Sequence, residues 1–107
     1  MISDSSSQRT RAKPPRVPVN HSEIESLFRK ESAWEHIASG VWTSDPVAEK
    51  TAPAKTYPGC DSEILKHLDA SGQHRATTHR IISRGTGGVP YHTAKDITIN
   101  GIKYYRR

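Results

Sequence analysis

The chain has 107 residues, of which 33% are hydrophobic and 25% charged, and its formal net charge is +5. This length and composition allow one domain with a small core. No apolar run is long enough for a transmembrane helix, and the first residues lack the apolar stretch of a secretory signal. A single cysteine, Cys60, excludes an internal disulfide and fits a reducing compartment. We therefore expect a cytoplasmic protein that does not contact a membrane.

The charges are unevenly distributed along the chain. Residues 1–19 carry a net +3, residues 20–72 a net −4 and residues 73–107 a net +6. A cationic segment of this kind attracts and steers a polyanion. The alternative is a soluble basic surface that binds no ligand.

Residues 1–19 form the first unit in chain order. They contain few apolar residues and four basic ones, and the segment PPRVP favours an extended backbone. We expect a disordered basic arm that either lies in the minor groove of DNA or is a plain flexible tail. Its basic residues are Arg9, Arg11, Lys13 and Arg16.

Residues 22–39 are expected to form the first helix. Ser22 and Glu25 have the spacing of a capping box, and Gly40 is a suitable stop. The apolar residues form one helical stripe if the register slips near Glu31. The stripe, which we expect to face the core, consists of Ile24, Leu27, Phe28, Trp34 and Ile37.

Residues 41–60 are expected to connect the first helix to the next one. They contain three prolines and show no clear period. Because twenty residues is long for a structureless loop in a small domain, a short strand or helical turn is expected within it. Trp42 and Tyr57 are the side chains able to attach this segment to the core.

Two further helices and a hairpin complete the expected domain, residues 20–107. Residues 61–70 and 74–84 are interpreted as the second and third helices, separated by a turn that contains Gly72. Residues 96–106 are predicted to form a hairpin around Asn100-Gly101, because this dipeptide lies between alternating apolar and polar residues. One face of the hairpin carries Ile97, Ile99, Ile102 and Tyr104, and the other carries Thr98, Lys103 and Tyr105.

Two short basic helices around a glycine-containing turn, followed by a hairpin, are typical of a winged helix-turn-helix. The third helix presents Arg and short polar side chains, which suit base edges and phosphates. We therefore predict an α+β winged helix-turn-helix-like domain with three helices, a C-terminal hairpin and a disordered arm. The expected DNA-binding residues are Arg75, Thr77, His79, Arg80, Arg84, Lys95, Lys103, Arg106 and Arg107, with Arg9, Arg11, Lys13 and Arg16 of the arm.

Residues 62–107 also resemble the corresponding part of excisionase-like and MerR-like winged helix-turn-helix domains. The resemblance is carried by Arg75-Ala76-Thr77 and by Ile81-Ile82, followed by GVPYHTAKDITINGIKYYRR. It implies that Arg75, Thr77, His79 and Arg80 contact DNA and that the hairpin is the wing.

We expect from these patterns a sequence-specific binder of double-stranded DNA that is associated with the nucleoid, either a transcriptional regulator or an accessory factor of a mobile element. The first helix offers a surface for a homodimer, since binding to a palindromic DNA site usually needs two copies of the protein. No catalysis, small-molecule substrate, cofactor or metal is expected. The spacing of Cys60, His67, His74, His79 and His92 matches no zinc site.

Two alternatives remain open. An RNA- or ribosome-binding module would use Tyr91, Tyr104 or Tyr105 as stacking platforms, so burial of Tyr104 would favour the winged interpretation. A small basic ribonuclease would need two of His74, His79 and His92 within hydrogen-bond distance, with Arg80 and Tyr91 nearby.

Overall fold

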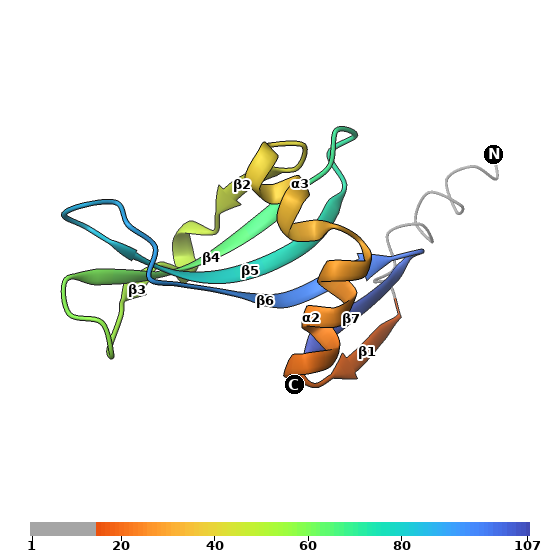
Figure 1. The fold of residues 1–107 in the computed structure, drawn as a ribbon, viewed down its shortest axis with the longest axis horizontal. Helices are drawn as coiled ribbons and strands as arrows, with labels where there is room; N and C mark the ends of the chain where they lie inside the picture. Colours follow the sequence, from red (N-terminus) through yellow and green to blue (C-terminus); the bar gives the residue numbers. More distant parts are fainter. Residues whose placement is uncertain (1–14) are drawn as a thin grey trace, which may run out of the picture.

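Two α-helices and one seven-stranded sheet make up residues 15–107, the part of the chain that the computed structural model describes (Figure 1). The helices are α2 (His21–Lys30) and α3 (Ala33–Ser39), and a 3-10 turn, η1, spans Ala48–Lys50. The strands are β1 (Arg16–Val19), β2 (Thr43–Pro46), β3 (Ala52–Pro53), β4 (Cys60–Leu68), β5 (His74–Ser83), β6 (Tyr91–Ile99) and β7 (Ile102–Arg106).

The predicted winged helix-turn-helix is wrong, because both of its helices are strands. Residues 61–70 fall largely in β4, and residues 74–84 fall almost entirely in β5. The two strands pair antiparallel from Cys60–Ser83 to Leu68–His74, so the expected turn is the tip of a hairpin. β5 is rich in Thr and Ile, whose branched side chains suit a sheet. A run this short satisfies a helical and an extended pattern alike, and pairing with distant strands decided between them.

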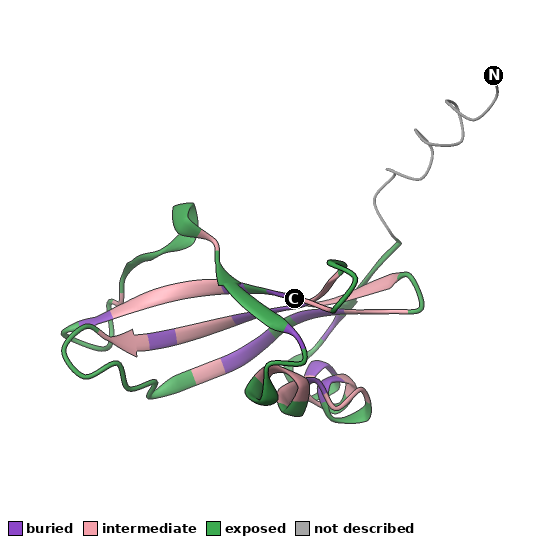
Figure 2. Cartoon of the chain, turned by 90° about the horizontal axis from the view of Figure 1, so that it is seen from above, coloured by how far each residue is buried: buried purple, intermediate pink, exposed green. Residues whose placement is uncertain are grey.

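The sheet follows the order β1-β7-β6-β5-β4-β2, and β3 pairs with β4. All neighbours are antiparallel except β1 and β7, which are parallel. The first strand thus lies beside the last, and α2 and α3 lie between β1 and β2 in the chain. Both helices pack on the same face of the sheet (Figures 1 and 2). Residues 16–19 of the expected arm form β1, and residues 1–14 lie outside the described residues.

The expected first helix is two helices. α2 is capped by Asn20 rather than Ser22: Glu23 N–H donates to Asn20 Oδ1 and Asn20 N–H donates to Glu23 Oε1, each at 2.8 Å. The break occurs at Glu31 and Ser32, where Ser32 has a left-handed backbone with φ of 53°. This interruption turns Trp34 and Ile37 onto the core together with Phe28, as the slipped stripe required.

The last hairpin agrees with the sequence expectations, and the connecting segment does so except at Tyr57, which does not join the core. Residues 41–60 contain β2, η1 and β3, and Trp42 is buried while Tyr57 stays 36% exposed. Asn100 and Gly101 have φ of 51° and 78°, the left-handed pair that a two-residue hairpin turn requires. The hairpin's apolar face is the one that meets the core.

The core lies between the helices and one face of the sheet. Ile24 and Phe28 of α2 are fully buried against Ala76 of β5 and Ala94 and Ile97 of β6. Because strand residues alternate between faces, these contacts fix which side chains point to the helices and which point away. We call the first side the helix side and the second the open face.

Candidate nucleic-acid interface

The open face is the side of the sheet that neither α-helix covers (Figure 2). Ladder register and the contacts below place residues from five adjacent strands on it. They are Arg16 of β1, Lys103 and Tyr105 of β7, Tyr91, Thr93, Asp96 and Thr98 of β6, His74, Thr77, His79 and the buried Ile81 of β5, and Ser62, Ile64 and Lys66 of β4.

Cations predominate on the open face. Arg16 and Lys66 are exposed, and Lys103 is half-buried. Lys95 is also exposed, and it is the extra residue of β6 where the register with β5 shifts. Ala94 and Ile97, which flank Lys95 and Asp96 in β6, both face the core, so Lys95 and Asp96 lie on the open face. The face therefore carries positive charge across β1, β7, β6 and β4.

Register places two carboxylates beside these cations. Asp96 is buried, with 8% exposure, and its Oδ2 lies 3.7 Å from Lys103 Nζ. Its Oδ1 has no hydrogen-bond partner among the described residues. Asp45 is exposed on the edge strand β2, opposite Lys66. Asp96 therefore offsets the charge of Lys103, and the exposed cations of the open face are Arg16, Lys66 and Lys95.

Two groups of rings lie on the same face. Tyr91 is 37% exposed, and its ring meets the His79 ring edge-on with centroids 5.8 Å apart. His79 Nε2 is hydrogen-bonded to Ser62 Oγ, which orients the imidazole. Nearer the other edge, Arg16 Cζ lies 4.7 Å from the centre of the Tyr105 ring. Tyr105 thus lies beside a cation, whereas Tyr91 is in line with Ile81 and Ser62, four residues along β4 from Lys66.

His79 is held mainly in its neutral form. Burial lowers the pKa of its imidazole, and the nearby charges of Lys95 and Arg106 lower it further. A neutral imidazole against Tyr91 presents a flat, weakly polar surface to a ligand.

Three of the predicted DNA-reading arginines are neutralised by carboxylates instead. Each leaves the strand on the helix side, and Arg75 also stacks over Trp42, 5.0 Å from its ring centre. The shortest pair joins Arg80 Nε to Glu63 Oε1 at 2.7 Å. The pairs are Arg75 with Glu31 and Asp69, Arg80 with Glu63, and Arg84 with Asp61. These side chains stabilise the fold and are not gathered into one basic surface.

The other predicted contact residues are divided among different places. His79, Lys95, Lys103 and Arg16 share the open face, whereas Thr77 is buried there beneath His74. Arg106 lies near His21, and Arg107 N–H donates to Val19 O at 3.1 Å. The arm residues Arg9, Arg11 and Lys13 lie outside the described residues.

A chain of hydrogen bonds crosses the sheet on the helix side. Ser44 Oγ lies 2.8 Å from His67 Nδ1, and the Thr78 hydroxyl lies 2.7 Å from His67 Nε2 and 2.8 Å from His92 Nε2. The Trp34 ring caps His92 at 4.9 Å. Burial, with the charges of neighbouring groups, lowers the pKa of His67 to about 4 and also lowers that of His92.

The three histidines that a ribonuclease would need are separated. His79 lies on the open face, His92 on the helix side, and His74 near the tip of the β4–β5 hairpin. Within residues 15–107 no hydrogen bond joins any two of them. Tyr104 is half-buried against the core, while Tyr91 and Tyr105 remain on the open face.

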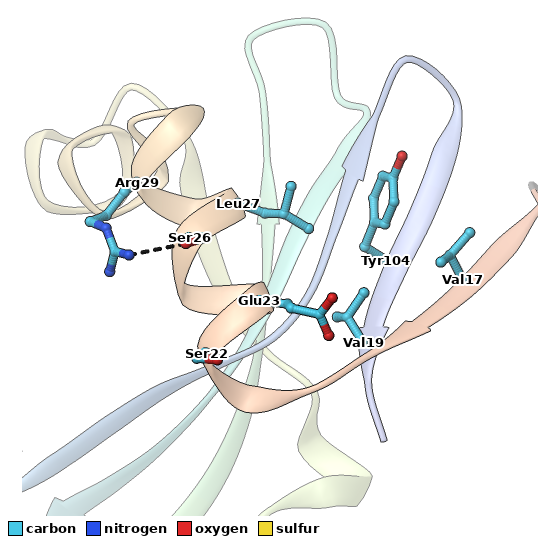
Figure 3. A pocket seen from close by; sticks show the side chains of 8 residues that line it. All are labelled: Val17, Val19, Ser22, Glu23, Ser26, Leu27, Arg29 and Tyr104. Carbon is cyan, nitrogen blue, oxygen red and sulfur yellow. Dashed lines mark hydrogen bonds between the residues drawn. The ribbon is translucent and has the colours of Figure 1, made fainter.

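A separate groove of about 540 Å³ lies on the helix side, between α2 and the β1–β7 edge (Figure 3). Its floor is apolar, and its rim carries one cation, Arg29, and one anion, Glu23. Glu23 is engaged in the cap of α2, and Arg29 donates to Ser26 Oγ at 3.1 Å. Its apolar side chains are Val17, Val19, Leu27 and Tyr104. The groove therefore lacks the excess positive charge that a polyanion requires.

Lys66 is the open-face cation that sequence reasoning missed. Within a helix spanning residues 61–70 it would be one more solvated lysine. In a strand spanning 60–68, successive side chains alternate between the two faces of the sheet. Lys66 therefore lies on the same face as Ser62, and His67 lies on the other face. The abundance of Thr and Ile in residues 74–83 was the available signal for extended structure.

Comparisons with known proteins add no relatives. No protein-family model matches the chain, and searches of curated proteins and of solved structures found no similar protein. Among the described residues, neither helix is long and apolar enough to cross a membrane.

Proposed function

We propose that this protein binds single-stranded nucleic acid on the open face of its sheet. The observation that supports this most is the combination, on the face that the α-helices leave uncovered, of exposed cations from several strands with the exposed Tyr91 ring and the half-buried Tyr105 ring. Single-strand binders use such an arrangement: cations follow the phosphates while bases stack on flat side chains.

The dimensions of the face agree with a short strand of nucleotides. Arg16 and Lys66 are separated by four strand spacings, which is about 19 Å at the usual interval between strands. Tyr105 lies near Arg16. Tyr91 belongs to β6, which is two strands away from the strand that carries Arg16. This length corresponds to a few nucleotides, in the range of a small single-strand site.

Single strands are favoured over a duplex by the kind of contact available. Residues 74–84 are extended and belong to the sheet, so they supply no helix for the major groove. Stacking on Tyr91 or Tyr105 requires bases that are free of a partner strand. Phosphate charge attracts duplex and single strand alike, so the rings distinguish the two ligands.

The test is equilibrium binding, followed by fluorescence anisotropy, to a labelled ten-nucleotide RNA, the DNA of the same sequence and the corresponding DNA duplex. We expect either single strand to bind more tightly than the duplex. About three cations contacting phosphates predict a slope of log K against log salt of about −2. Lys66→Gln and Lys95→Gln should each weaken binding and make that slope shallower by about 0.7.

The matched control is Lys30→Gln, which removes an exposed lysine from α2 on the helix side. It should leave affinity and slope unchanged within error. Tighter binding to the duplex would contradict the proposal and would indicate that duplex DNA is the ligand. Equal losses from the control and the open-face variants would mean that net charge, and not this face, drives binding.

A further inference from the structure

A polar cleft opens at the end of the sheet where β5 and β6 separate. Their ladder ends at the Ala76–Ile97 pair, although β5 begins at His74 and β6 continues to Ile99. The turns that follow β4 and β6 lie at the same end of the sheet (Figure 1). The space between the unpaired strand ends is about 460 Å³. The cleft is lined by Gln73, His74 and Arg75 on one side and by Thr98, Asn100 and Gly101 on the other.

Hydrogen-bonding groups line the cleft on both sides. Gln73 and Asn100 each carry an amide, which donates and accepts, and Thr98 carries a hydroxyl. No side-chain hydrogen bond within the described residues engages either amide group or the Thr98 hydroxyl. Among residues 15–107 these three groups are the polar side chains of the cleft that have no partner.

His74 adds an acceptor of defined orientation. Its Nε2 lies 2.9 Å from Ala76 O and 2.8 Å from Thr77 Oγ1. Because a carbonyl oxygen can only accept, Nε2 carries the proton and donates it. Burial lowers the pKa of this imidazole, so at neutral pH the other nitrogen, Nδ1, is an unprotonated acceptor.

The cleft is continuous with the cationic face. His74 and Thr98 are open-face residues, and the charges of Lys66 and Lys103 are close enough to affect the protonation of His74. Lys103 also pairs with Thr98 across the β6–β7 hairpin. A nucleotide whose base enters the cleft can therefore keep its phosphate beside lysines of the open face.

We propose that the cleft binds one base of the single strand and prefers bases that carry an exocyclic amino group, namely adenine or cytosine over uracil. This proposal rests on the proposed function. The amino group donates to the His74 acceptor, and the amides of Gln73 and Asn100 contact the remaining base edge. The open face supplies affinity for any strand, and the cleft supplies the preference for particular bases.

The test compares labelled RNA hexamers of adenine, cytosine and uracil by fluorescence anisotropy with the full chain. The adenine and cytosine hexamers should bind about tenfold more tightly than the uracil hexamer, the range of one good base contact. Gln73→Ala and Thr98→Val should each reduce that ratio several-fold, while affinity for the uracil hexamer stays within twofold. Thr51→Val, the same change at an exposed position beside β3, near the other end of β4, is the control and should leave the ratio unchanged.

The outcomes separate the two proposals. Binding to no hexamer would overturn both the proposed function and the base cleft. Equal binding to all three, a preference for uracil, or a preference that survives both cleft variants would overturn the cleft alone. Loss of the preference in Thr51→Val would also overturn the cleft, because Thr51 adjoins β3, which pairs with β4 at Ser62, six residues from Leu68 at the cleft end.

Discussion

The buried imidazole of His67 makes the fold sensitive to acid. Its side chain is fully buried, with both ring nitrogens hydrogen-bonded to the hydroxyls of Ser44 and Thr78. Burial is the main cause that lowers its pKa from 6.5 to about 4, and the nearby charges of His92, His74 and Arg80 lower it further. The imidazole of His67 is therefore harder to protonate in the folded chain than in the unfolded chain.

The sign and size of the effect follow from this difference. Above pH 6.5 the imidazole is neutral in both states, so its contribution to stability is fully present. As the pH falls from 6.5 towards 4, only the unfolded chain takes up the proton, and the free energy of unfolding decreases. The full loss is about 3 kcal/mol, and about 2 kcal/mol is lost by pH 5. For a small domain this is a large share of the total stability.

The assay is urea unfolding at pH 7, 6 and 5, followed by tryptophan fluorescence, for the wild type and for His67→Gln. The variant lacks the buried titrating group, so its loss of stability between pH 7 and pH 5 should be smaller by about 2 kcal/mol. The comparison uses the pH dependence, so a constant cost of the substitution cancels. His21→Gln, at an exposed position, is the control and should follow the wild type. If His67→Gln has the pH dependence of the wild type, the buried-imidazole account is wrong.

Three further results are expected. Tyr91→Ala should weaken single-strand binding by about 1–3 kcal/mol with little change in stability, because a stacking surface is lost. Titration with the ten-nucleotide RNA checks this prediction. Unchanged affinity would exclude Tyr91 from the interface. Arg80→Gln should leave that affinity within twofold, since Arg80 pairs with Glu63 on the helix side; a large loss would place the helix side in the binding surface. Phe28→Ala should lower the free energy of unfolding by about 3–5 kcal/mol in urea titrations, because the ring is fully buried in the core; a cost below about 1 kcal/mol would mean that the core is packed differently.

Local signals identified several elements correctly. Asn100-Gly101 predicted the β6–β7 hairpin and the faces of its side chains, because a left-handed dipeptide turn sets the strand register. Gly40 was expected to end the helical segment, and it ends α3 with φ of 80°. These features depend on backbone geometry over a few residues, so one sequence contains them fully.

Segments 61–70 and 74–84 could not be assigned in the same way. Each contains apolar residues at spacings compatible with a helix, and each is short enough to be extended as well. Their strand conformation comes from pairing with each other and with β6, which are contacts between residues distant in the chain. The wrong helix assignment also made the predicted site wrong, since a helix would have placed Arg75 and Arg80 on one exposed surface.

The sequence by itself determined the uneven distribution of charge, the apolar stripe of the first helical segment, the last hairpin and the scarcity of core-forming residues. Only the tertiary structure decided which cations remain available to a ligand. Arg80 and Arg84 are neutralised because antiparallel pairing brings β4 carboxylates beside them, whereas Lys66 and Lys95 reach the open face. The physical reason is that net charge is a property of composition, while the pairing of charges depends on the register between strands.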